Sequence, residues 1–149
     1  MQCALTLIFQ QGFTMTATAK GSVLIEVGAG ELIDKITILK IKAQRMTDPT
    51  KLRNVNHELD VLTRACWENL APSAELDRLE NELREVNEAL WVIEDDIRAC
   101  EDARDFGPKF IELARAVYIQ NDRRAKIKKQ VNDVCGSSIV EEKSYTQFS

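Results

Sequence analysis

Apolar side chains recur at steps of three and four residues through most of this chain, and this is the spacing of one face of an α-helix. The longest run lies within residues 76–100 and keeps the alternation throughout. Its members are Leu76, Leu79, Leu83, Val86, Leu90, Ile93, Ile97 and Cys100. An unbroken alternation of this kind is typical of coiled coils and helical bundles. The pattern therefore predicts one long helix here.

A second long helix is expected over residues 108–135. Gly107 and Pro108 separate it from the first, because proline is favoured in the first turn of a helix. Gly136 can adopt the left-handed conformation that ends a helix.

Two shorter helices are expected before this pair. One covers residues 31–46, and the other begins at Pro49 with Asp48 as its cap, while Ser73 is expected to cap the long helix that follows. The first of them has apolar positions at Leu32, Ile36, Leu39, Ala43 and Met46. The sequence thus predicts an all-α fold, an antiparallel helical bundle of about four helices, two long and two shorter.

The N-terminal part has a different character. Residues 22–27, SVLIEV, are rich in β-branched side chains and predict a strand or an extended arm before the first helix. Residues 1–21 contain a short apolar run without the basic residues of a secretory signal, and Met15 is an alternative start. We expect residues 1–21 to be a loosely ordered extension and residues 22–149 to form a single helical domain.

Composition excludes several classes of protein. Of the 149 residues, 44% are hydrophobic, which is enough for one domain with a core, and the net charge of −4 disfavours nucleic acid as a partner. No stretch approaches the ~20 apolar residues of a membrane-spanning helix. The four cysteines form no CxxC pair, and His57 is the only histidine, so no metal site is expected. The thiols are expected to be reduced, as in a cytoplasmic protein. No cofactor motif occurs.

The lengths of the expected helices favour self-association, and their charges favour the pairing of the two long helices. A helix over residues 76–100 is too long for the two shorter helices to cover, and a second copy of the chain is the simplest cover. Residues 75–105 hold twelve acidic side chains against four arginines, whereas residues 108–129 hold seven basic ones against two acidic. Such stretches attract each other when they lie antiparallel, which fits a hairpin of the two long helices. From the lengths we expect a homodimer.

The apolar row of the last helix is interrupted by polar residues. Asn121, Arg124 and Lys128 occupy core positions there, within NDRRAKIKK. If the chain turns at Gly107, they lie level with a polar group on the preceding helix, composed of Asn87, Trp91 and Glu94. Two interpretations stay open. Glu94 and Arg124 can form an internal ion pair with the asparagines fixing register, or Arg124 and Lys128 can hold an anionic ligand.

Two further segments are possible accessories to such a site. Gly28 and Gly30 precede a helix whose first amide groups can attract an anion, with Lys35 close behind, although a plain turn explains the glycines equally well. The C-terminal segment VEEKSY can fold back over the polar group as a lid and bring Lys143 and Tyr145 to it.

Four blocks of the sequence resemble a family of small bacterial helical proteins of unknown function. They are GELIDKITILKIK (30–42), LWVIEDDIRACE (90–101), DFGPKFIELARAVYIQNDRR (105–124) and SSIVEEKSY (137–145), and the resemblance covers residues 22–145. It implies a bacterial, cytosolic, single-domain protein and no particular reaction.

A weaker likeness links LIDKITIL (32–39) to the all-helical chorismate mutases, small dimers that grip a dicarboxylate with Arg and Lys. The arginine that they carry before the aspartate is Ile33 in this chain, which removes a catalytic contact. No other catalytic constellation is visible. The sequence favours a non-catalytic oligomeric binding protein, with a small-anion binder as the second class and an enzyme as the third.

Overall fold

The computed structural model describes residues 21–144, so the expected N-terminal extension, apart from Gly21, lies outside the described part. Within it the chain forms four helices and no strand. The helices are α1 (Ala29–Arg45), α2 (Pro49–Asn69), α3 (Ala74–Ala103) and α4 (Pro108–Cys135). The prediction of an all-α fold with two shorter and two long helices is confirmed.

The ends of the helices follow from their capping residues. The carboxylate of Asp48 accepts hydrogen bonds from the backbone N–H groups of Thr50 and Lys51, at 2.8 and 3.0 Å. The hydroxyl of Ser73 accepts one from the N–H of Leu76 at 3.1 Å. Gly136 ends α4 in the left-handed conformation, with φ of 64°. These side chains and this glycine satisfy groups that a helix end leaves free, as the sequence predicts.

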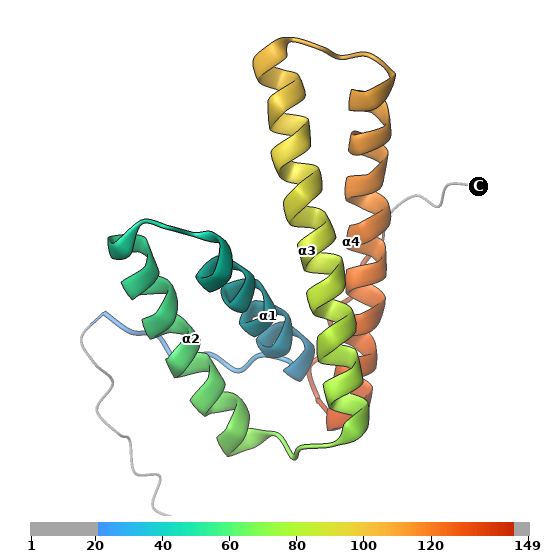
Figure 1. Ribbon diagram of the computed structural model, residues 1–149. Helices are drawn as coiled ribbons and strands as arrows, with labels where there is room; N and C mark the ends of the chain where they lie inside the picture. The colour runs from blue at the N-terminus through green and yellow to red at the C-terminus, as the bar shows by residue number, and fades with distance from the viewer. Residues whose placement is uncertain (1–20, 145–149) are drawn as a thin grey trace, which may run out of the picture.

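The four helices form two antiparallel hairpins that diverge from a shared base (Figure 1). The joining element is α1, which packs against α2, α3 and α4, whereas α2 packs against α1 alone among the helices. The bundle is therefore open on one side. None of the helices within residues 21–144 combines the length and the apolar character needed to cross a bilayer.

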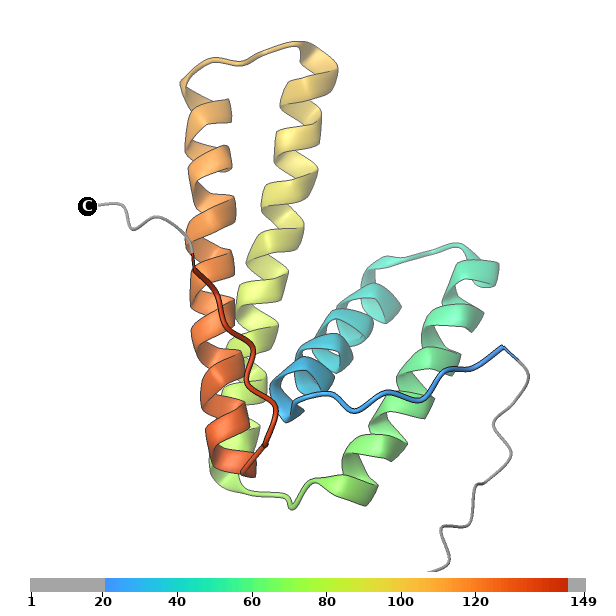
Figure 2. The same cartoon turned by 180° about the vertical axis from the view of Figure 1, so that it is seen from behind.

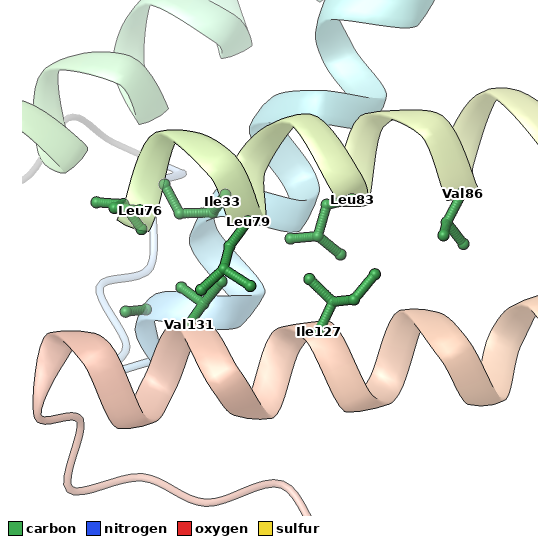
Figure 3. Close-up of a cluster of buried hydrophobic side chains, with 8 residues drawn as sticks. Ile33, Leu76, Leu79, Leu83, Val86, Ile127 and Val131 are labelled. Atoms are coloured by element: carbon green, nitrogen blue, oxygen red, sulfur yellow. The ribbon is translucent and has the colours of Figure 1, made fainter. Parts of the chain in front are cut away.

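The main core lies where α1 meets the lower half of the α3–α4 hairpin (Figure 3). Its buried side chains are Ala29, Ile33, Leu76, Leu79, Leu83, Val86, Ile127 and Val131. Ile36, Leu39 and Ile41 are buried as well, so α1 is enclosed around most of its circumference. The sequence predicts only one apolar face for α1, because the packing of this helix between α2 and the α3–α4 hairpin is a tertiary feature.

The upper half of the hairpin has no such cover (Figure 1). We call it the distal half, residues 90–117. On α3 the first four members of the apolar row are at most 6% exposed, whereas Leu90, Ile93 and Ile97 are only half-buried. The same face of one helix thus changes from core to partly solvated surface at the level where α1 ends.

Two non-helical segments flank the helices. Residues 22–27 form an arm and no strand, and its side chains Val23, Leu24 and Ile25 are 75% exposed or more. After Gly136 the chain turns back, and residues 137–144, the C-terminal segment, run along α4 past the start of α1 (Figure 2).

Candidate functional site

A buried carboxylate, that of Asp34 in α1, is the centre of the polar groups in this structure. Asp34 is 1% exposed. Its Oδ1 accepts hydrogen bonds from Nε of Arg124 at 2.8 Å and from Nδ2 of Asn87 at 2.9 Å, and its Oδ2 accepts one from Nη2 of Arg124 at 2.5 Å. Three helices therefore meet at one side chain.

Thr37 completes this network. Its hydroxyl donates to the backbone oxygen of Asp34 at 2.7 Å and accepts from Nδ2 of Asn87 at 2.9 Å. The hydrogen bond to Asp34 raises the pKa of Arg124 above its ordinary value, although partial burial acts in the opposite direction. The result is a fixed guanidinium whose charge is balanced from within the protein.

The predicted ion pair between Glu94 and Arg124 is wrong. Glu94 is exposed, and its Oε2 lies 3.5 Å from Nη2 of Arg98 on the same helix. Arg124 turns instead to Asp34, because α1 lies against α4 and offers a carboxylate inside the bundle, where the pairing is screened far less by water.

An open groove of about 560 Å³ lies above this network, between α1, α3 and α4. Five of the six residues proposed from the sequence line it, namely Asn87, Trp91, Glu94, Asn121 and Arg124. Nδ2 of Asn121 donates to the backbone oxygen of Val117 at 3.0 Å, and the guanidinium carbon of Arg45 lies 5.8 Å from the centre of the Trp91 ring. These five side chains therefore lie close together, as their spacing predicts.

Lys128, the sixth residue proposed from the sequence, does not line the groove. Its Nζ lies 2.5 Å from the carboxylates of Glu31 in α1 and Glu141 in the C-terminal segment. Burial disfavours the charged form of Lys128, but the hydrogen bonds to Glu141 and Glu31 outweigh this and raise its pKa. Lys128 and Lys143 line a second hollow, of about 800 Å³, between α4 and the C-terminal segment. Tyr145 lies outside the described residues.

The glycine turn has a structural partner. The N–H of Gly30 donates to Oδ1 of Asn132 at 2.7 Å. A Cβ on Gly30 would lie 2.3 Å from the backbone oxygen of Lys128, so only glycine lets α1 and α4 approach this closely. Lys35 pairs with Glu58 of α2 at 2.7 Å on the surface and takes no part in the groove.

Sequence reasoning missed Asp34, Thr37 and Asn132. The first two lie one turn apart and between the apolar residues Ile33 and Ile41, and this spacing was the available signal for a second buried face on α1. Asn132 follows Lys128 by one turn on the interrupted face of α4 and could have been included with it.

Other kinds of chemistry find less support. His57 is exposed, and residues 21–144 contain no group of three or more His, Cys, Asp or Glu side chains placed to hold a metal ion. Ile33, which stands where the chorismate mutases carry an arginine, is 1% exposed in the apolar core. That position cannot contact a ligand.

Comparison with known proteins gives one match. No curated protein and no solved structure matches the chain. The model of a protein family described as a family of unknown function (DUF6165) matches residues 23–148, which is most of the chain. The chain therefore belongs to the DUF6165 family.

Proposed function

We propose that the protein is a non-catalytic interaction protein that works as a homodimer, with a second copy packed on the distal half of the α3–α4 hairpin. The main observation behind this proposal is that the burial of the apolar side chains changes along α3. Leu79, Leu83 and Val86 are fully buried, the next three members of the row are half-buried, and Cys100, close to the turn of the hairpin, is buried again. When one row of apolar side chains is buried along one part of a helix and partly exposed along the next, a packing partner is missing from the exposed part.

The lengths of the helices give the same result. At about 1.5 Å per residue, the 30 residues of α3 extend about 45 Å and the 17 residues of α1 about 26 Å. Because α1 starts at the base of the hairpin, about 20 Å of the hairpin is left without a third helix. Two helices alone bury little apolar surface between them.

Charge favours a second copy over an unrelated partner. Within the distal half, residues 90–105 hold six acidic side chains against two arginines, and residues 108–117 hold two basic side chains against one acidic, so the two helices carry net charges of −4 and +1 there. In a two-fold symmetric pair, α3 of one copy can lie antiparallel beside α4 of the other, and the charges then attract at both ends of the interface.

The mass in solution tests the proposal. Light scattering of the purified protein at high micromolar concentration should give twice the 16.9 kDa of one chain. Ile97→Asp should give the monomer mass with the helical content kept. Val92→Asp on the opposite, exposed side of α3 is the matched control and should leave the dimer intact. A monomer mass for the unchanged protein would contradict the proposal.

We also propose a bacterial, cytoplasmic protein. The likeness of the four sequence blocks supports a bacterial origin, and the free thiols of Cys66, Cys100 and Cys135 fit a reducing compartment.

Binding of a small anion through Arg124 and Lys128 is the competing proposal. Both cations already face carboxylates of the protein, so an anion would have to displace Asp34 or the pair Glu31 and Glu141. Anion binding is therefore less favourable than dimer formation, and binding of inorganic phosphate to the purified protein would support it.

A further inference from the structure

We propose that the groove between α1, α3 and α4 binds a small zwitterion with an apolar body, of which an apolar amino acid is the simplest example. The groove overlaps the lower end of the distal half, because Leu90, Trp91 and Asp95 belong to both, but the inference uses none of the arguments for the dimer. It rests on the two charged groups of the groove that have no partner.

These two groups are Lys42, on the α1 side of the groove, and Asp95, on the α3 side. Within residues 21–144 the side chain of neither residue forms an ion pair or a hydrogen bond, although each of the other charged side chains that line the groove has one; Lys42 is half-buried and Asp95 is exposed. Arg124 is held by Asp34, and Glu94 lies beside Arg98. Lys42 and Asp95 therefore face one groove from opposite sides without meeting.

A ligand that carries both charges is complementary to this arrangement. Its carboxylate would contact Lys42 and the remaining N–H groups of Arg124, and its ammonium group would contact Asp95. A bare anion satisfies only one side and places its charge close to Asp95 and Glu94 on the other. A zwitterion leaves the net charge of the groove unchanged.

The rest of the groove suits an apolar body. Ile38, Ile41 and Leu90 line it between the two charged sides, and Trp91 adds an aromatic ring. The volume of about 560 Å³ falls in the range of known small-molecule sites. Asn121 adds an amide oxygen, since only its Nδ2 is engaged, by the backbone oxygen of Val117.

Trp91 provides the readout. The chain has two tryptophans, and Trp67 is 79% exposed on α2, so Trp67→Phe leaves Trp91 as the only emitter without disturbing packing. This variant is titrated with leucine, isoleucine, valine, methionine and phenylalanine. At least one of them should change the emission and bind with a dissociation constant below about 1 mM, a value that corresponds to the few contacts described. No response to any of the five, with equilibrium dialysis also negative, overturns the proposal.

Analogues that lack one charge separate the two contacts. For leucine they are 4-methylpentanoate, which lacks the ammonium group, and 3-methylbutylamine, which lacks the carboxylate, and the corresponding analogues are used for any other amino acid that binds. Each should bind at least about tenfold more weakly than its parent, because one charged hydrogen bond is lost. Equal binding of all three, or binding of inorganic phosphate alone, also overturns the proposal, and the second result supports the competing anion site.

Two variants assign the charges to residues. Lys42→Gln should reduce the preference for leucine over 3-methylbutylamine, since Arg124 still contacts the carboxylate, and Asp95→Asn should remove the preference for leucine over 4-methylpentanoate. Neither residue holds the fold through an ion pair or hydrogen bond, so both variants should keep the melting temperature. Lys109→Gln and Asp102→Asn, exposed near the far end of the hairpin, are the matched controls and should bind as the parent does.

Discussion

Asp34 of α1 and Arg124 of α4 are ninety residues apart in the sequence and meet through two hydrogen bonds, one to each oxygen of the carboxylate. The side chain of Asp34 is 2% exposed, and the side chain of Arg124 is 28% exposed. Removing one partner from such a pair leaves the other charge buried, with neither an ion partner nor water to stabilise it. The pair therefore adds to the apolar contacts that hold α1 on the hairpin.

Arg124→Met should lower the free energy of unfolding by about 3 kcal/mol, since Asp34 would be left buried and unpaired. Asp34→Leu should also destabilise the fold, while the double variant should be closer to the parent than either single one. Urea unfolding measures all three. Arg123→Met is the control, because Arg123 is exposed and lies 3.8 Å from Glu85. A loss no larger than that of this control would contradict the role of the pair.

Gly30→Ala should destabilise the protein by about 1–3 kcal/mol, the usual effect of overpacking. The new methyl group would meet the backbone oxygen of Lys128 at 2.3 Å, and a helix backbone cannot move aside as a side chain can. Thermal unfolding followed by circular dichroism measures the loss. Gly107→Ala, whose methyl group would meet only the side-chain oxygen of Asp105 at 3.0 Å, should cost less. Equal melting temperatures for the two variants would show that α1 can shift without penalty.

Asn132→Ala should cost about 1–3 kcal/mol, because the buried N–H of Gly30 would lose its acceptor. Asn69→Ala is a suitable comparison, since Asn69 bonds only to the backbone of its own helix on the surface. Hydrogen exchange at the Gly30 amide gives a direct readout and should speed up in the Asn132 variant alone. Unchanged exchange there would mean that the amide has another acceptor.

Attachment of the C-terminal segment should depend on pH at acid values. The hydrogen bond from Lys128 lowers the pKa of Glu141 below its ordinary 4.5. A carboxyl with a lower pKa in the folded state stabilises that state above the unfolded value, and this contribution is lost as the pH falls through the folded pKa. The pKa of Lys128 is raised in the folded state, so its contribution to the stability of that state is lost only as the pH rises above the ordinary lysine pKa of 10.5.

An NMR titration of the Glu141 carboxyl carbon measures this shift. In Lys128→Met the pKa of Glu141 should return toward its ordinary value, and the segment should detach over the whole pH range. An identical titration in the two proteins would mean that the pairing of Glu141 with Lys128 does not form in solution.

The sequence predicted most of the fold because the signals involved are local. The alternation from Leu76 to Cys100 specifies a long helix without reference to any neighbour, and the caps at Asp48, Ser73 and Gly136 act within one turn of their own helix. The half-buried state of Ile93 and Ile97 was foreseen in outline, since the lengths alone show that the shorter helices cannot cover the long pair.

The candidate site was predicted only in part because it depends on how α1 docks. Asn87, Asn121 and Arg124 lie on two helices that are consecutive in the chain, so their relative height follows from one turn at Gly107. The partner of Arg124 comes from a helix ninety residues away. An aspartate within LIDKIT is expected to be solvated from its sequence, and only tertiary contact makes Asp34 the most buried acid in the described part of the chain.

The distance in sequence between Asp34 and Arg124 also has a consequence for biosynthesis. The ribosome makes α1 first and α4 last, so the carboxylate stays in water, and the sides of α1 that will be enclosed stay exposed, until Arg124 emerges. The lower core cannot close on a nascent chain, and assembly has to wait for nearly the full domain. Chaperones that shield apolar helices would find their substrate in this interval.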